Sequence, residues 1–508
     1  MSKKYMPLNL ASNIIMFSVS FGISFFLSPF IIDRLGREAY GFIGLIGNFI
    51  SYASIVTIAL NSMAGRFITI KIHEDDMKSA NIYFNSVLIG NLFLSLVFLI
   101  ISAVLLINLQ LILHIPEHLT SDVKTAFFLA TIEFIISLIS SVFGVATFVR
   151  NKLYLSSWRS IQSNIIRVTV IIILFTLMPA RISFLNIATL TAAVFVLFTN
   201  IHFTRTLTPD IKISKIYYNA CAVIELLKCG VWNTFSRLSQ ILNTGLDLLL
   251  TNIFLGASLM GTLNISKTLP TYFITFTATI VSVFAPELTI AYAHKNTEQI
   301  IKTTKQSVKI MTFFTSLFFA FIIIYSKQFY KLWLPSQDAN LIYILTVLSV
   351  IHMPLSSGVN SLYNIFTITN KVKTSSLVLL SSSILNVIIV VTCVKILPQN
   401  VAIYAVAGIS SMLALLVVLF FTVPFASACL KISLKTFYHD LILCIIGNVI
   451  ASLIFLSVKY FIPATSWTLL LAALAVSGIL TVTVNFFVLL NSNERAFLID
   501  RLLKRGQV

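Results

Sequence analysis

The sequence predicts an all-α polytopic membrane protein with about fourteen transmembrane helices. Of its 508 residues, 58% are hydrophobic and only 10% are charged, and the mean hydropathy is +0.97, whereas a soluble domain carries roughly 25% charged residues. Apolar runs of the length that crosses a bilayer, about 20 residues, recur along the whole chain. The excess of basic residues lies in short clusters between these runs, which is typical of membrane topology and not of a nucleic-acid-binding face.

The first apolar run begins close to the N-terminus. Lys3 and Lys4 precede an apolar segment from Leu8 to Ile32. This segment is longer than the ~7–15-residue core of a signal peptide and has no A-x-A cleavage site. We therefore predict an uncleaved first transmembrane helix.

Counting the remaining runs in the same way gives fourteen predicted spans. They are residues 9–32, 40–62, 82–108, 125–148, 160–178, 185–203, 231–254, 257–283, 308–326, 341–365, 375–396, 401–424, 439–461 and 467–490. The first two spans, and the seventh and eighth, are joined by very short connections.

The orientation follows from the basic residues that flank the spans. With the N-terminus inside, the inner segments hold 24 Lys and Arg residues and the outer segments hold 8. Cytoplasmic segments carry such an excess, so we predict that both termini are cytoplasmic, in a bacterial inner membrane. Two inner connections, near 210–228 and 290–306, and the basic tail 494–505 are expected to form amphipathic surface helices.

The five cysteines form no CxxC pair and have no metal-ligand spacing to the histidines. No G-x4-G-K-[ST] motif for ATP occurs either. We expect no metal and no cofactor.

A short pattern recurs after 220 residues. Leu35-Gly36-Arg37-Glu38-Ala39-Tyr40-Gly41 aligns with Leu255-Gly256-Ala257-Ser258-Leu259-Met260-Gly261. Each element joins the first two helices of a half, and glycine there supplies positive φ and close helix approach. Six helices separate the copies, so the halves share one orientation and form a parallel repeat.

The element from Arg34 to Gly41 resembles the L-G-x-E-x-(Y/F)-G signature of the polysaccharide transporter family. The helix around Asp247, the L-G-x4-G after it, and Pro286 are similar to that family as well. Its members are the Wzx-type flippases of the multidrug/oligosaccharidyl-lipid/polysaccharide superfamily. The resemblance implies two six-helix lobes around a central cavity and two further C-terminal helices. We expect an N-lobe at 1–222, a C-lobe at 223–430, and the last two helices with the amphipathic tail at 431–508.

Two related families fit less well. Flippases of the peptidoglycan precursor carry arginines in the first helix, but here no Arg or Lys lies between Lys4 and Arg34. Multidrug exporters often hold a cation on an acidic residue of that helix, and the first acidic residue here is Asp33, at its outer end.

Arg167 and Arg237 lie inside predicted spans, each about 10 Å from the inner end of its helix. An intramembrane charge costs roughly 2.5–3.5 kcal/mol on insertion scales, so each is a candidate functional residue. Paired guanidinium groups suit a diphosphate. We predict that they clamp the diphosphate of the substrate from opposite lobes, with Lys267 nearby; snorkelling toward headgroups and structural pairing are the alternatives.

Three further charged residues lie inside the predicted spans. Asp247 and Lys267 flank the turn at Gly256 at similar depth, which favours an ion pair or an ion site at Asp247. Glu133 is a second candidate for proton or sodium coupling, or is hydrogen-bonded to a Ser or Asn.

Polar side chains also form stripes on two predicted helices. The candidates for lining a sugar-accepting cavity are Asn13, Ser20, Ser24, Asn360 and Asn364. Close packing of small residues explains the serines equally well.

Together these features predict a transporter and not an enzyme. The substrate implied by the resemblance is an oligosaccharide repeat unit, of O-antigen, capsule or a similar polysaccharide, on a polyprenyl diphosphate. It would move from the cytoplasmic to the outer leaflet by alternating access. Polysaccharide polymerase and chain-length machinery are expected as partners. The alternatives are a cation-coupled multidrug exporter and a membrane polysaccharide polymerase or ligase, although no outer connection exceeds about 16 residues.

Overall fold

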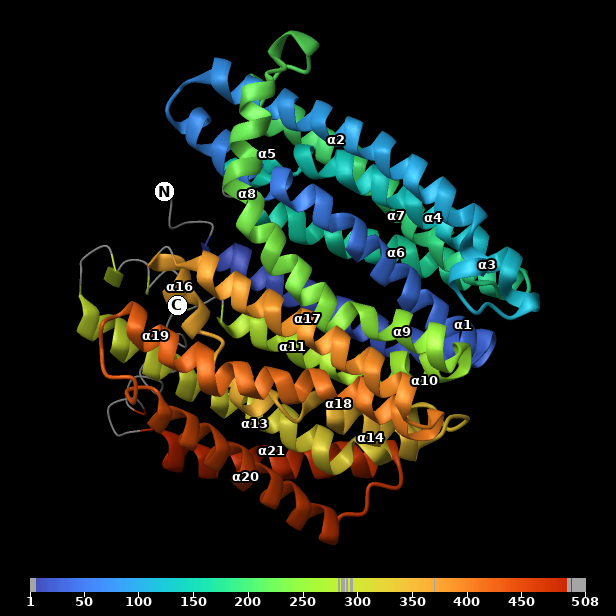
Figure 1. The fold of residues 1–508 in the computed structure, drawn as a ribbon, viewed down its shortest axis with the longest axis vertical. Coiled ribbons are helices and arrows are strands. Elements are labelled where there is room, and N and C mark those ends of the chain that lie inside the picture. Colours follow the sequence, from blue (N-terminus) through green and yellow to red (C-terminus); the bar gives the residue numbers. More distant parts are fainter. Residues whose placement is uncertain are drawn as a thin grey trace. The chain divides into compact units, whose positions relative to one another are not determined.

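The computed structural model describes residues 6–490 and residue 495, with gaps at 151, 282–283, 285–287, 289–290, 293–295 and 370. The described residues form helices, turns and loops but no strand, which confirms the all-α class (Figure 1). The chain divides into two compact units, Met1–Gly261 (unit 1) and Thr262–Val508 (unit 2). The lobe boundary at residue 222 stays a prediction. The amphipathic tail 494–505 lies outside the described residues except for Arg495.

In unit 1, α4 and α6 pack on α7, and α1 packs on α2, α6 and α8. The elements of unit 1 are α1 (Met6–His73), α2 (Met77–Ile107), α3 (Leu109–Ile112), η2 (Glu117–Leu119), α4 (Thr120–Phe143), α5 (Val145–Val149), α6 (Leu153–Leu177), α7 (Ile182–Leu207), η3 (Lys215–Tyr217), α8 (Ala220–Gln240), the π-helix η4 (Ile241–Gly245) and α9 (Leu246–Leu255). Helix α10 (Ala257–Ser266) crosses the boundary between the units.

In unit 2, α13 packs on α14, α15, α20 and α21, and α17 packs on α18. The elements of unit 2 are α11 (Thr268–Val281), α13 (Thr297–Trp333), α14 (Ala339–Val350), α15 (Met353–Val359), α16 (Leu362–Ile368), α17 (Val372–Ile396), α18 (Gln399–Val417), the π-helix η5 (Val418–Thr422), α19 (Val423–Cys429), α20 (Tyr438–Phe461) and α21 (Trp467–Leu489).

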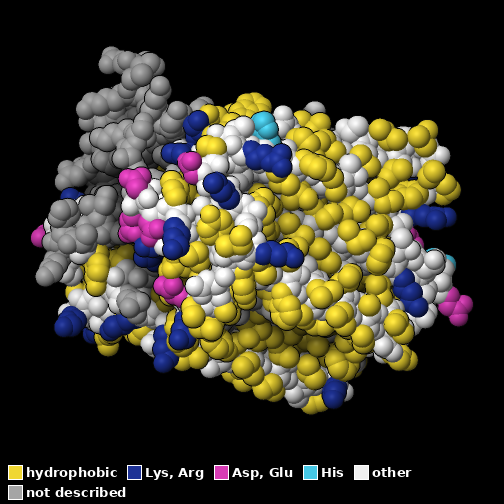
Figure 2. Space-filling view, turned by 90° about the horizontal axis from the view of Figure 1, so that it is seen from above, with side chains coloured by type: hydrophobic (Ala, Val, Ile, Leu, Met, Phe, Trp, Pro, Cys, Tyr) yellow, Lys and Arg dark blue, Asp and Glu magenta, His cyan; other side chains and the backbone are white. Residues whose placement is uncertain are grey.

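Eleven helical segments of the described chain are long and apolar enough to cross a membrane. One of them lies in α1, which contains the first two predicted spans in a single 68-residue helix with a kink. The seventh and eighth predicted spans fall on the interrupted helices α8–η4–α9 and α10–α11. Within the described residues, the fourteen predicted segments lie mostly on helix, with breaks such as those at Gly144 and at 351–352. Hydrophobic side chains dominate the face drawn in Figure 2, as expected for a surface in lipid.

The two glycines predicted to form matched turns share an unusual backbone conformation. Gly36 has φ 82° and ψ 166°, and Gly256 has φ 90° and ψ 170°. The second glycines of the two elements, Gly41 and Gly261, pack together: a Cβ on Gly41 would lie 2.9 Å from the Cα of Gly261. The prediction that these glycines supply positive φ and close approach is confirmed.

Several helices begin at a side chain that caps the first backbone N–H groups. Asp76 Oδ1 accepts from Ser79 N at 3.0 Å to start α2, and Asn219 Oδ1 accepts from Cys221 N at 2.8 Å to start α8. Asn296 starts α13 and Ser466 starts α21 in the same way.

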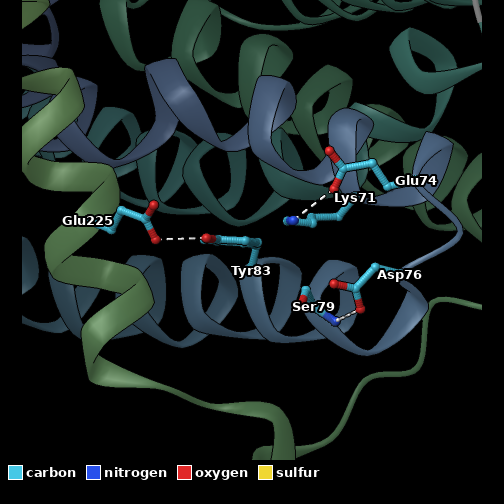
Figure 3. Close-up of polar contacts among 6 residues, drawn as sticks. All are labelled: Lys71, Glu74, Asp76, Ser79, Tyr83 and Glu225. Atoms are coloured by element: carbon cyan, nitrogen blue, oxygen red, sulfur yellow. Dashed lines mark hydrogen bonds and ion pairs between the residues drawn. The ribbon is translucent and has the colours of Figure 1, made fainter.

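A small polar cluster lies at and beside the turn between α1 and α2 (Figure 3). Lys71 Nζ lies 2.8 Å from Glu74 Oε2, and the Tyr83 hydroxyl donates to Glu225 Oε2 at 2.7 Å. Hydrogen bonds from Ser79 lower the pKa of Asp76, and the hydrogen bond to Glu74 raises the pKa of Lys71. These contacts close the turn and attach α8 to α2.

The predicted surface helix near 210–228 is wrong for residues 210–219 but coincides with helix α8 from residue 220 onward, and the one near 290–306 coincides with helix α13 from residue 297 onward. Residues 210–219 are mostly non-helical because buried asparagines of α2 hold their backbone. Asn81 and Asn85 bond the backbone of residues 210, 212 and 214. Residues 297–306 belong to the 37-residue helix α13, and 293–295 lie outside the described residues.

Candidate functional site

A polar site lies where α6 packs on the first half of α1. Asn164 Nδ2 of α6 donates to Ser20 Oγ of α1 at 2.9 Å. Arg167 follows Asn164 by three residues and so lies on the same face of α6. Its Nε is buried and makes no hydrogen bond with a described residue. Arg167 therefore has an unused donor inside a membrane-spanning helix, and a guanidinium in that state suits an anionic ligand.

A second arginine of α6 was missed as a candidate. Sequence reasoning placed Arg159 in a connection, but α6 begins at Leu153 and includes it. Arg159 Nη1 donates to Asn200 Oδ1 of α7, while its Nε is buried without a described partner. The helix start was missed because the polar residues 156–160 interrupt the apolar pattern. Arg167 now lies 14 residues, or ~21 Å, from the start of its helix, deeper along the helix than predicted.

Arg237 lies near the end of α8, which begins at Ala220 and not near 231. Its Nη1 donates to Gln240 Oε1 at 2.5 Å on the same helix. The guanidinium of Arg237 is half-exposed, and its bond to Gln240 lies within α8. Arg167 and Arg237 both belong to unit 1, so they share one compact unit although the predicted boundary at 222 separates them.

A π-helical turn creates a further polar site beside Asp247. In η4, the carbonyl of Gly245 accepts hydrogen bonds from Asn48 Nδ2 at 2.7 Å and from the Tyr52 hydroxyl at 2.6 Å, both on α1. Asp247 follows in the first turn of α9 and is 3% exposed. Single π-helical turns inside longer helices occur often at functional sites. Asn48 and Tyr52 were missed, because a π-turn has no clear sequence signal.

The other charged candidates have different surroundings. Glu133 of α4 accepts a hydrogen bond from Ser137 Oγ at 2.9 Å, one helical turn away. This contact agrees with the predicted alternative of a hydrogen bond to a serine. Lys267 is half-buried between α10 and α11, in unit 2, whereas Asp247 belongs to unit 1. Their ion pair stays a prediction.

The predicted cavity-lining residues are placed as follows. Ser20 bonds Asn164, and Ser24 accepts from Ser28 Oγ at its backbone carbonyl. The side chain of Asn13 lies outside the described residues. In unit 2, Asn360 lies at the break between α15 and α16, and Asn364 Nδ2 is buried without a described partner.

Unit 1 also contains an apolar cavity of about 310 Å³ between α1, α2 and α4. Phe49, Phe98, Phe127 and Phe134 contribute to its wall, as does the ring of Tyr52. Its few polar atoms make it suitable for a hydrocarbon group and not for a sugar.

Comparison with solved structures identifies the fold. A structure described as lipid II flippase MurJ in an inward closed conformation aligns with a TM-score of 0.68 and 17% identity, covering 93% of this chain and 98% of that one. An inward-facing multidrug resistance MATE family transporter of the MOP superfamily aligns at 0.63, with 17% identity over 82% and 96% of the two chains. A MOP superfamily transporter from Pyrococcus furiosus aligns at 0.58, with 15% identity over 84% and 96%. The chain is thus a multi-pass membrane protein with the fold of these transporters.

One relative is similar in sequence over its whole length. The Bacillus subtilis (strain 168) protein EpsK, an uncharacterized membrane protein, is 26% identical over 503 residues, which cover 98% of each chain. No model of a known protein family matches the chain.

Proposed function

We propose that this protein is a flippase that moves polyprenyl-diphosphate-linked oligosaccharide units across a bacterial inner membrane, from the cytoplasmic to the outer leaflet. The observation that carries the proposal is Arg167, whose buried Nε has no described partner. The fold supports it, because one structure that shares the fold is a lipid II flippase and others are transporters.

The energetics of this transport need no ATP site. A diphosphate carries about two negative charges, and moving them outward down an inside-negative potential releases ~2.3 kcal/mol per charge per 100 mV. Proton or sodium coupling through Glu133 or Asp247 would add to this driving force. Removal of the product by a polysaccharide polymerase and chain-length machinery would do the same.

The diphosphate contact is tested by replacing Arg167 and Arg237. Arg→Ala at either position removes charge-assisted hydrogen bonds worth ~1.5–3 kcal/mol, which should lower the affinity for the diphosphate roughly ten- to a hundredfold. Arg→Lys should rescue only partly, because an ammonium group cannot bond two oxygens in the planar geometry of a guanidinium. The measurement is surface polysaccharide in a flippase-null strain, at equal membrane abundance of each variant.

Arg205 provides the matched control because it is exposed in the last turn of α7. Arg205→Ala should keep full activity. Full activity of the normally inserted Arg167→Ala, Arg237→Ala double variant would contradict the contact. If Lys serves as well as Arg at both positions, the arginines only reach toward headgroups.

A cation-coupled multidrug exporter is the second candidate, favoured by the alignment with a multidrug resistance MATE family transporter. Export of a fluorescent cationic drug from everted vesicles separates the two functions. Drug efflux without restored polysaccharide would favour the exporter, and restored polysaccharide without efflux would favour the flippase.

A further inference from the structure

Unit 2 contains a line of buried polar side chains where α13, α20 and α21 pack together, which we call the polar seam. At its middle, Asn485 Nδ2 of α21 donates to Ser316 Oγ of α13 at 3.0 Å and to the carbonyl of Gly447 of α20 at 3.4 Å. Nearby, Thr312 Oγ1 of α13 lies 2.9 Å from Cys444 Sγ of α20. Side chains of all three helices therefore meet at one polar interface.

The seam extends from these contacts toward both ends of the helices. On α21, Ser477 and Thr481 precede Asn485 at intervals of four residues and so share its face. Ser477 lies near the hydroxyl of Tyr325, on α13. Toward the start of α20, Asp440 lies one turn before Cys444, and it faces Lys305 of α13.

Part of the seam's hydrogen-bonding capacity is unused. Five of its oxygen atoms are buried without a hydrogen-bond partner among the described residues: Tyr325 Oη, Asp440 Oδ2, Ser477 Oγ, Thr481 Oγ1 and Asn485 Oδ1. These residues are at most 2% exposed. An unpaired polar atom is costly inside a membrane protein, where lipid offers no replacement. Several unpaired polar atoms along one interface indicate that the seam holds a ligand that forms hydrogen bonds with these atoms.

The spacing of these atoms identifies the ligand as water. A bound cation draws its oxygen ligands to within about 2.6 Å of one point. Ser477 and Asn485 are eight residues apart on one helix, or ~12 Å, so one cation cannot satisfy both. A file of water molecules can, because each internal water makes two to four hydrogen bonds to polar groups around it.

Asp440 gives this file a titratable end. Its Oδ2 lies 4.0 Å from Lys305 Nζ, too far for a hydrogen bond. Lys309 and His439 are also close enough to act on its charge. Lys305 is 36% exposed, so this end of the seam is near the surface at which α13 and α20 begin. At the other end, Lys459 Nζ lies 5.7 Å from the centre of the Tyr325 ring.

We propose that the polar seam between α13, α20 and α21 holds a file of internal waters and conducts protons between Asp440 and Tyr325. A proton bound by the Asp440 carboxylate passes to the first water, and each water then releases one proton to the next as it accepts one. No net chemical change remains in the protein. This activity needs no lipid-linked substrate, so it stands or falls independently of the proposed flippase function.

The presence of water is tested by radiolytic hydroxyl-radical labelling of the intact protein, read by mass spectrometry. Radicals form from water at the site, so Tyr325 and Cys444 should be labelled although both are 0% exposed. Tyr330 is the matched control: it is also 0% exposed on α13, but its hydroxyl is bonded to Thr346 on α14. We expect Tyr325 to be labelled several-fold faster than Tyr330. Equal rates would show a dry seam and overturn the proposal.

Proton conduction is tested in proteoliposomes that contain a pH-sensitive dye, with a potassium gradient and valinomycin to set the potential. Asp440→Asn should abolish most proton uptake, and Thr481→Val should lower it several-fold while keeping the side-chain shape. Ser457→Ala, on an exposed position of α20, should leave uptake unchanged. Uptake unaffected by both seam variants would overturn the proton route. Labelling of Tyr325 that sodium suppresses relative to choline would identify a cation as the occupant and overturn it too.

Discussion

Gly36 and Gly256 adopt a backbone conformation that other residues avoid. Their φ values of 82° and 90°, with ψ near 170°, lie in a region essentially restricted to glycine. A Cβ on either residue would meet nothing within 4 Å. Any cost of a side chain there comes from the backbone and not from a steric clash.

We therefore predict that Gly36→Ala and Gly256→Ala each destabilise the protein by about 1–3 kcal/mol. The measurement is thermal unfolding of the purified protein in detergent. Gly47→Ala is the matched control, because Gly47 also has free space around it but lies in α1 without a positive φ. It should be neutral or stabilising by ~0.5–1 kcal/mol. Equal effects at all three positions would contradict this account.

At the scale of elements, α2 holds the connection between α7 and α8. Asn85 Nδ2 donates to the carbonyl of Lys212 at 2.8 Å, and Asn85 Oδ1 accepts from Ser214 N at 2.9 Å. Asn81 makes the equivalent pair with residues 210 and 212. Two asparagine side chains one helical turn apart thus provide hydrogen-bond partners for backbone groups of this connection.

Replacing Asn85 should release this connection. Asn85→Leu leaves the Lys212 carbonyl and the Ser214 N–H unpaired, at a cost of about 1–3 kcal/mol. We expect faster cleavage by trypsin after Lys212 and Lys215. Asn108→Ala is the control, because the Asn108 side chain donates to the carbonyl of Val104, four residues earlier at the end of α2. If cleavage of Asn85→Leu matched that of the native protein, the asparagines would not hold the connection.

At the scale of the whole molecule, the distribution of basic residues predicts the topology. Inner segments hold 24 Lys and Arg residues and outer segments hold 8 when the N-terminus is cytoplasmic. A reporter fused at Val508 should therefore be cytoplasmic, and one near Ile462, between α20 and α21, should be outside. Alkaline phosphatase and fluorescent-protein fusions measure this directly. Reversed signals would overturn the topology and, with it, the direction of the proposed transport.

The sequence by itself determined the features that depend on composition and local pattern. Apolar runs of bilayer length predicted the helices, because a backbone in lipid must satisfy its own hydrogen bonds. Two matched L-G-x4-G elements predicted positive φ, because glycine adopts such a φ without a steric cost. Features that depend on neighbours had no such signal. The length of α1 across Gly36 and the π-turn before Asp247 required the tertiary structure. So did the pairing of Arg159 with Asn200 and the asparagine contacts that replaced part of a predicted surface helix. The physical reason is that hydrophobicity is a property of a segment, whereas the partner of a buried polar group is decided by which helices pack against it.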